Sequence, residues 1–262
     1  MEYATIKELV SLAETAETSI SEIVLQVEAE EEEISESEVR KSMLANLEVM
    51  KEAVDYGRQN KIQTGGGLVG DEALKLEKYL ASASEAEQNN IYNKIITYAL
   101  ATAEVNAGMG KIVAGPTAGA SGIVPAVLLA VGEENNLSDQ KLVQALFTAA
   151  GLGYVVSRKA TLAGAAGGCQ AECGVGAAMA AGAAVELRGG SPRMAADAFA
   201  LALKNLLGLV CDPVAGLVEV PCVKRNGFAA SHAYTASTMA LAGIESVIPA
   251  DEVIMAMTEI GD

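Results

Sequence analysis

Residues 160–184 read ATLAGAAGGCQAECGVGAAMAAGAA, and 17 of these 25 residues are alanine or glycine. Side chains this small let helices pack with their backbones close together, although each glycine in a helix interior costs roughly 1 kcal/mol relative to alanine. A sequence that keeps so many glycines needs close contacts or special backbone angles in this region. The stretch therefore predicts closely packed helices interrupted by glycine-rich turns.

Helical periodicity extends outward from this stretch over most of the chain. The expected helical segments are 6–13, 20–27, 43–54, 74–80, 91–105, 229–241 and 251–257, with further helices starting at Ile123, Ser138 and Ser191-Pro192. Ser35 or Ser37 can cap the helix that contains 43–54. Only 111–114 and 217–220 have any strand character. The sequence predicts an all-α fold, a helical bundle-like domain in which glycine-rich loops carry the functional site.

The charge distribution divides the chain into two parts. Residues 1–60 contain 15 acidic and 5 basic side chains, out of a formal net charge of -16 for all 262 residues. Residues 1–105 are predicted to form an acidic helical subdomain, and residues 106–262 a glycine- and alanine-rich region that carries the site. At this length the two parts fit one integrated domain, 1–262.

Net charge and hydropathy exclude several classes of partner. An acidic chain lacks the cationic face that nucleic acids and anionic membranes require. Residues 114–131 are the most apolar run, but Pro116, Ser121 and Pro125 interrupt it, so no membrane span is expected. The N-terminus lacks the pattern of a signal peptide. We therefore expect a cytoplasmic protein whose cysteines are not structural disulfides.

All four cysteines fall in two short segments, GGCQAECG at 167–174 and CDPVAGLVEVPC at 211–222. Neither spacing is the C-x-x-C of a zinc ribbon or a thioredoxin site. One interpretation is that an alanine-rich core simply accepts cysteine as a small apolar residue. The other is a metal or iron–sulfur site, because three of the four cysteines adjoin glycine or proline and so lie on turns.

Two other features of the sequence have both a functional and a structural interpretation. The loop GPTAGASG at 115–122 precedes the expected helix at Ile123, and it suits either an anion cradle or a structural turn. It is not a P-loop, because no Gly-Lys-Ser/Thr closes it. His232, the only histidine, falls inside a helical pattern, which favours a structural role over that of a base. No lysine lies in a Schiff-base context, so pyridoxal phosphate is not indicated.

Several of these motifs together resemble a known family. The relevant stretches are PTAG at 116–119, IVP at 123–125, GCQAECG at 168–174, CDPVAGLVEVPC at 211–222 and RN at 225–226. They are similar to the alpha chain of the iron–sulfur-dependent L-serine dehydratases, and the resemblance covers essentially the whole chain. It implies that the protein deaminates L-serine to pyruvate and ammonia.

The resemblance also assigns residues. It implies a four-iron four-sulfur cluster whose open iron binds the serine hydroxyl and carboxylate and acts as a Lewis acid on the leaving hydroxide. The positions that match its ligands are Cys169, Cys211 and Cys222. The positions expected to contact substrate are Thr117, Gly119, Ser121, Gly122 and Asn226.

Two departures limit what is carried over. Single-chain members of the family have asparagine where Ala118 stands, and Cys173 is not one of the family ligands, so it either packs in the core or coordinates the open iron. The sequence also lacks the domain with a Ser-Ser-His-Thr type motif that other members contain. A separate beta chain is therefore expected, and the catalytic base is expected on it. The alternatives are a related β-eliminase acting on L-cysteine or L-threonine, and a non-catalytic iron–sulfur redox or sensor protein.

Overall fold

The computed structural model describes residues 2–261, and in this range the prediction of an all-α fold is confirmed. The helices are α1 (Ile6–Thr15), α2 (Ile20–Glu31), α3 (Glu36–Gln59), α4 (Glu72–Ala81), α5 (Glu85–Gln88), α6 (Ile91–Ala107), α7 (Ile123–Glu134), α8 (Asp139–Lys159), α9 (Gly164–Gly167), α10 (Val175–Leu187), α11 (Pro192–Lys204), α12 (Cys222–Leu241) and α13 (Ala250–Gly261). Three short turns complete them: the 3-10 turns η1 (Ala118–Ala120) and η3 (Val214–Gly216), and the π-helical turn η2 (Gln170–Gly174). No strand occurs among the described residues.

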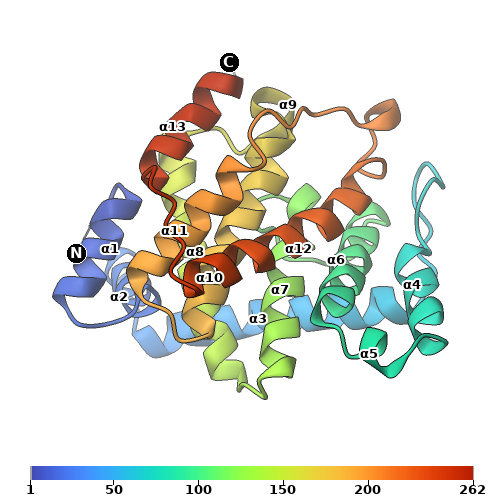
Figure 1. Cartoon of the computed structure of the whole chain (residues 1–262), viewed down its shortest axis with the longest axis horizontal. Helices are drawn as coiled ribbons and strands as arrows, with labels where there is room; N and C mark the ends of the chain where they lie inside the picture. The colour runs from blue at the N-terminus through green and yellow to red at the C-terminus, as the bar shows by residue number, and fades with distance from the viewer. Residues whose placement is uncertain (1, 262) are drawn as a thin grey trace.

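Helix α10 lies at the centre of the molecule and contacts α7, α8, α11 and α12 (Figure 1). Every residue from Val175 to Val185 is buried. A Cβ on Gly182 would overlap the side chain of Leu152 and lie 3.1 Å from the carbonyl oxygen of Ala195. The alanine and glycine content thus allows four helices to surround one, as the sequence predicted.

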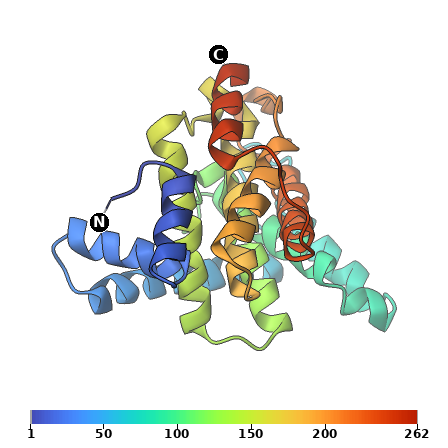
Figure 2. The same cartoon turned by 60° about the vertical axis from the view of Figure 1, so that its left-hand side comes forward.

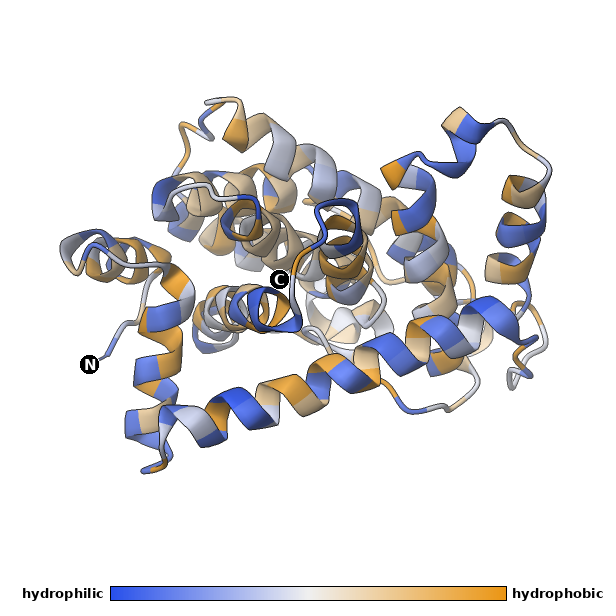
Figure 3. Ribbon diagram, turned by 90° about the horizontal axis from the view of Figure 1, so that it is seen from below, coloured by the Kyte–Doolittle hydropathy of each residue, from blue (hydrophilic) through white to orange (hydrophobic). Residues whose placement is uncertain are grey.

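Helix α3 is the longest helix and runs along one side of the molecule, with polar and apolar residues alternating along it (Figure 3). Its buried face includes Leu47, Met50 and Val54. Helices α1 and α2 lie toward one end of the molecule and α4 and α5 toward the other, as Figures 1 and 2 show. Ser35, not Ser37, caps α3, in a reciprocal capping box with Glu38.

The largest hydrophobic core cluster joins side chains from Tyr3 to Met257. It includes residues on both sides of the boundary near residue 105, and the division into two subdomains stays a prediction. In the described range, no helix is both long enough and apolar enough to cross a bilayer.

One helix boundary was predicted wrongly. Helix α12 begins at Cys222 and not at residue 229. The segment 222–228 carries three consecutive polar residues and a glycine, so it has no clear apolar period. It is helical because Val223 is buried and Gly227 packs against Ile96 and Leu100 of α6. The segments 111–114 and 217–220 are irregular.

Candidate functional site

The two cysteine segments meet at one end of α10. Cys169 follows Gly168, whose φ of +81° is in the region that favours glycine, and it leads directly into η2. The N–H of Gln170 donates to the carbonyl of Leu209 at 3.0 Å, and the N–H of Gly208 donates to the Gln170 side chain at 2.9 Å. These bonds hold the start of the 205–221 loop, which contains Cys211, against η2.

Arg225 links the same loop to α12. Its Nη1 atom lies 2.7 Å from Oδ1 of Asp212 and donates to the carbonyl of Val210 at 3.1 Å. The guanidinium also donates to the thiol of Cys169. Because Arg225 lies one turn after Cys222, a single side chain connects all three segments that carry cysteines.

The four thiols lie in different environments. Cys169 and Cys173 are buried, Cys222 is half-buried and Cys211 is exposed. The hydrogen bond with Cys173 lowers the pKa of the Cys169 thiol to about 7, and the charge of Arg225 acts in the same direction. Burial raises the pKa of Cys222 to about 11. Cys169 is therefore the thiol best prepared to act as a thiolate ligand.

The loop 115–122 is joined to the cysteine region through Asn226. The Asn226 Oδ1 atom accepts from the N–H of Gly122 at 3.0 Å, and Nδ2 donates to the carbonyls of Gly119 at 2.8 Å and Cys222 at 2.9 Å. The asparagine is fully buried. Since both amide hydrogens are used within the protein, Asn226 fixes the position of the loop relative to Cys222.

Four unused hydrogen-bonding groups lie in this loop. The hydroxyls of Thr117 and Ser121 are buried and have no partner in the described chain. The N–H groups of Ala118 and Gly119, at the start of η1, donate to no acceptor among residues 2–261. Buried polar groups are rarely left unpaired, so the loop has donors available for a bound ligand.

Comparison with known proteins identifies the family. The family described as "Serine dehydratase alpha chain" matches residues 15–262. This chain belongs to that family.

Individual relatives agree with this membership. A probable L-serine dehydratase alpha chain of Bacillus subtilis is 47% identical over 259 residues, which are 99% of this chain and 86% of the relative. The L-serine dehydratase alpha chain of Peptoniphilus asaccharolyticus is 40% identical over 98% of this chain and 88% of its own length. An L-serine dehydratase of Streptomyces coelicolor is 38% identical over 99% of this chain, but the match covers only 57% of that protein.

The cysteines do not form a site for a single metal ion within residues 2–261. No group of three or more Cys, His, Asp or Glu side chains within residues 2–261 is arranged to hold one metal ion. A single zinc would need its thiolates within about 2.3 Å of itself. A cluster of four irons and four sulfides is larger and holds its cysteines further apart. Cys211 and Cys222 both interact electrostatically with Cys169, so these three thiols, from three different segments, lie near one another.

The family's predicted site residues fall into two groups. Cys169, Cys211 and Cys222 lie on the three segments that Arg225 connects, and Thr117, Gly119, Ser121, Gly122 and Asn226 lie in or against the loop 115–122. Gly122 packs closely against α6, and a larger residue does not fit there because its Cβ would overlap the carbonyl oxygen of Ala99. Ala118 is exposed. Cys173 is buried in the main hydrophobic core, as Cys169 is, and its role at the site stays a prediction.

His232 has the structural role that its helical context favoured. Its Nε2 atom lies 3.0 Å from the carbonyl oxygen of Ala202, and Nδ1 lies 3.5 Å from Asn205 Nδ2. Both ring nitrogens thus face groups of the 192–205 region, not the cysteines.

Sequence reasoning missed the carboxylates that support the site. Glu219, between Cys211 and Cys222, accepts hydrogen bonds from the N–H groups of Gly66 at 2.6 Å and Leu68 at 2.9 Å, and from the Thr64 hydroxyl at 3.0 Å. These bonds lower the pKa of Glu219. The available signal was the run Thr64-Gly65-Gly66-Gly67, whose free N–H groups need an acceptor.

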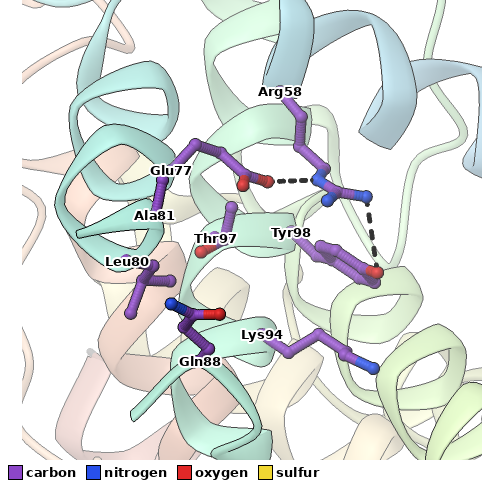
Figure 4. Close-up of a pocket in the computed structure, with 8 residues that line it drawn as sticks. All are labelled: Arg58, Glu77, Leu80, Ala81, Gln88, Lys94, Thr97 and Tyr98. Carbon is purple, nitrogen blue, oxygen red and sulfur yellow. Dashed lines mark hydrogen bonds and ion pairs between the residues drawn. The ribbon is translucent and has the colours of Figure 1, made fainter. Parts of the chain in front are cut away.

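A hollow of about 210 Å³ lies between α3, α4 and α6, away from the cysteines (Figure 4). Its charged side chains are already paired: Arg58 with Glu77, and Lys94 with Glu133 at 3.1 Å. Tyr98 donates to Glu133 at 2.8 Å. Because these pairs satisfy one another, this pocket offers no unpaired charged side chain to a ligand.

Proposed function

We propose that this chain is the alpha subunit of an iron–sulfur-dependent L-serine dehydratase. It acts in the cytoplasm with a separate beta chain and converts L-serine to pyruvate and ammonia. The observation that carries the proposal is the convergence of Cys169, Cys211 and Cys222 at the end of α10, next to a loop with unused donors, in a chain of the serine dehydratase alpha chain family.

The three cysteines are proposed to hold a four-iron four-sulfur cluster. When bound, the cluster supplies a Lewis acid for the β-hydroxyl of serine through an iron that no protein side chain occupies. The protein prepares the ligands: Arg225 and Cys173 stabilise the thiolate of Cys169, and Gln170 fixes the segment that contains Cys211.

The loop 115–122 is proposed to bind the serine. Thr117, Ser121 and the N–H group of Gly119 donate to the substrate carboxylate, because they are the donors without a protein partner. Gly122 and Asn226 set the distance between these donors and Cys222. Loss of the Cα proton and the β-hydroxyl releases water and gives aminoacrylate, which tautomerises and hydrolyses to pyruvate and ammonia.

The base that removes the Cα proton is proposed to lie on the beta chain. His232 is engaged by Ala202 and Asn205 and does not face the site. Two relatives are named as alpha chains, and the Streptomyces relative, named L-serine dehydratase, is considerably longer than this chain, which supports a second component. The exposed side chains of Val210, Val214 and Val218 on the 205–221 loop also support a partner that covers this face.

The test is anaerobic reconstitution with iron and sulfide, followed by iron counts and a pyruvate assay with and without the beta chain. Four irons per chain and pyruvate formation that depends on both L-serine and the beta chain are expected. Cys211→Ala and Cys222→Ala should abolish cluster assembly and activity; full activity in either variant contradicts the ligand assignment.

The same preparation separates the alternative functions. Relative kcat/KM values for L-serine, L-threonine and L-cysteine decide between the serine dehydratase and a related β-eliminase. A redox or sensor protein would hold a cluster whose spectrum does not change when serine is added.

A further inference from the structure

Glu172 is a carboxylate beside the site that has no role in the assignments above. It lies in η2, three residues after Cys169, and its side chain is partly exposed. A Cβ on Gly119 would lie 3.5 Å from each carboxylate oxygen, and a Cβ on Gly164 would overlap Oε2. The carboxylate therefore lies between the loop 115–122 and the start of α9, in a space that two glycines leave open.

The groups that interact electrostatically with Glu172 are thiols, and none of them is a cation. Within the part of the chain that the structure describes, its side chain accepts no hydrogen bond and forms no ion pair. Its electrostatic interactions are with the thiols of Cys173, Cys211 and Cys222, and each is repulsive toward the thiolate form.

The nearby cation Arg225 does not compensate Glu172. Its guanidinium is paired with Asp212 and donates to the Val210 carbonyl and the Cys169 thiol. A partly buried carboxylate without a cation or donor costs free energy, and a positively charged ligand group would remove that cost.

The loop that faces Glu172 has the opposite chemistry. The hydroxyls of Thr117 and Ser121 and the N–H groups of Ala118 and Gly119 lack acceptors among the described residues. An α-amino acid carries an ammonium and a carboxylate on the same carbon. It can therefore place a cation against Glu172 and an anion against the loop donors at the same time.

We propose that Glu172 binds the α-ammonium group of the amino-acid substrate. This inference rests on the proposed function and deepens it, because it names the group that distinguishes an amino acid from the corresponding 2-hydroxy acid. The positively charged ammonium donates to the Glu172 carboxylate, and Gly119 and Gly164 provide the space for this contact.

The experiment compares Glu172→Gln with wild-type enzyme, each as the reconstituted complex with the beta chain. L-serine and L-glycerate are titrated separately, and binding is followed by the change in the cluster's electronic spectrum as well as by steady-state kinetics. L-glycerate is the probe that has a hydroxyl where serine has its ammonium. Iron content is counted in every preparation.

Glu172→Gln should keep four irons and weaken serine binding by about 10- to 100-fold, the range for one lost hydrogen bond between charged groups. L-glycerate binding should stay the same or become tighter. Equal weakening of both ligands, unchanged serine binding, or loss of the cluster in this variant would each overturn the proposal, the last by making Glu172 part of the cluster's support.

Two further variants complete the test. Gly164→Ala displaces the carboxylate but keeps its charge, so it should weaken serine more than glycerate, and it replaces Glu172→Gln if that variant fails to fold. Glu134→Gln, at the exposed end of α7, removes one carboxylate far from any assigned residue and should change neither ligand. Failure of the proposed function is recognised separately, because wild-type enzyme would then form no pyruvate from serine.

Discussion

The centre of the molecule and the end that carries the cysteines use the same small residues but are held together by different forces. Around α10, alanine, glycine and valine are completely buried between four helices. In the 205–221 loop, similar residues are largely exposed. Two polar side chains from outside, Gln170 and Arg225, hold this loop, and its own Glu219 bonds to the 64–70 loop. The comparison teaches that close packing fixes the scaffold here, whereas charged hydrogen bonds fix the site.

The largest expected loss of stability comes from adding a bulky side chain to the closely packed helix α10. Gly182→Leu would force a side chain against Leu152 and the backbone of Ala195, and overpacking of this kind costs about 3 kcal/mol. Chemical denaturation should show this loss for the whole chain. Gly65→Ala is the matched control, because a Cβ at Gly65 meets no atom within 4 Å, and it should change stability by less than about 0.5 kcal/mol.

Removing the hydrogen bonds of Glu219 should destabilise only the 64–70 loop around it. Glu219→Ala removes the acceptor of two N–H groups and the Thr64 hydroxyl, so hydrogen exchange in 64–70 should accelerate about tenfold or more, as expected for the loss of charged hydrogen bonds. Exchange in α10 should not change. If both regions accelerate together, the site and the scaffold are one cooperative unit and the comparison fails.

Stability is expected to depend on pH because of a second carboxylate, Glu104, which contacts residues 70–73. Fully buried Glu104 accepts from the N–H groups of Gly70, Glu72 and Ala73. Burial raises its pKa to about 7, and in its protonated form it donates to the Glu72 carboxylate, which Lys224 also contacts.

The sign of this effect follows from the raised pKa. Between about pH 5 and 7 the folded chain holds a proton that the unfolded chain has released, so stability should fall as pH rises, by about 1 kcal/mol per pH unit. Glu104→Gln keeps a donor toward Glu72 and should flatten the dependence. Denaturation midpoints at three pH values in this window are sufficient, and an equal slope in wild type and variant would contradict the assignment.

The smallest expected effect comes from the N-cap of α11, a helix that packs against α10. Ser191 caps α11 by accepting from the N–H of Met194 at 3.2 Å. Ser191→Ala should cost about 1 kcal/mol of global stability, which is the usual value of an N-cap, without changing exchange in the 205–221 loop. Ser42→Ala, on the exposed face of α3, is the control and should cause no loss.

The sequence predicted the helical scaffold well because its signals are local. The caps at Ser35 and Ser191 and the start at Ile123 follow from neighbouring residues. It failed at the first turns of α12, where Lys224, Arg225 and Asn226 interrupt the apolar period. There the helix depends on packing of Val223 and Gly227 against other elements, which the local pattern does not contain.

The candidate site divides in the same way. The residue types and their glycine and proline neighbours pointed to Cys169, Cys211, Cys222 and the loop 115–122, and the similarity of whole motifs gave the family. The roles of Glu219 and Arg225 were not found, because each acts on residues that are not its neighbours in sequence: Glu219 lies 153 positions from Gly66, and Arg225 lies 15 from Val210.

By itself the sequence determined the all-α class, the crowded alanine-rich helix α10, and the set of thiols available as ligands, since helix periodicity and side-chain chemistry are written in neighbouring residues. Only the tertiary structure decided that Asn226 has both amide hydrogens engaged within the protein, that Arg225 connects the cysteine segments, and that Glu172 lies without a cation beside a loop with free donors. These contacts join residues that are distant in sequence and come together only when the helices pack. The pKa values and charge pairing at the site follow from these contacts.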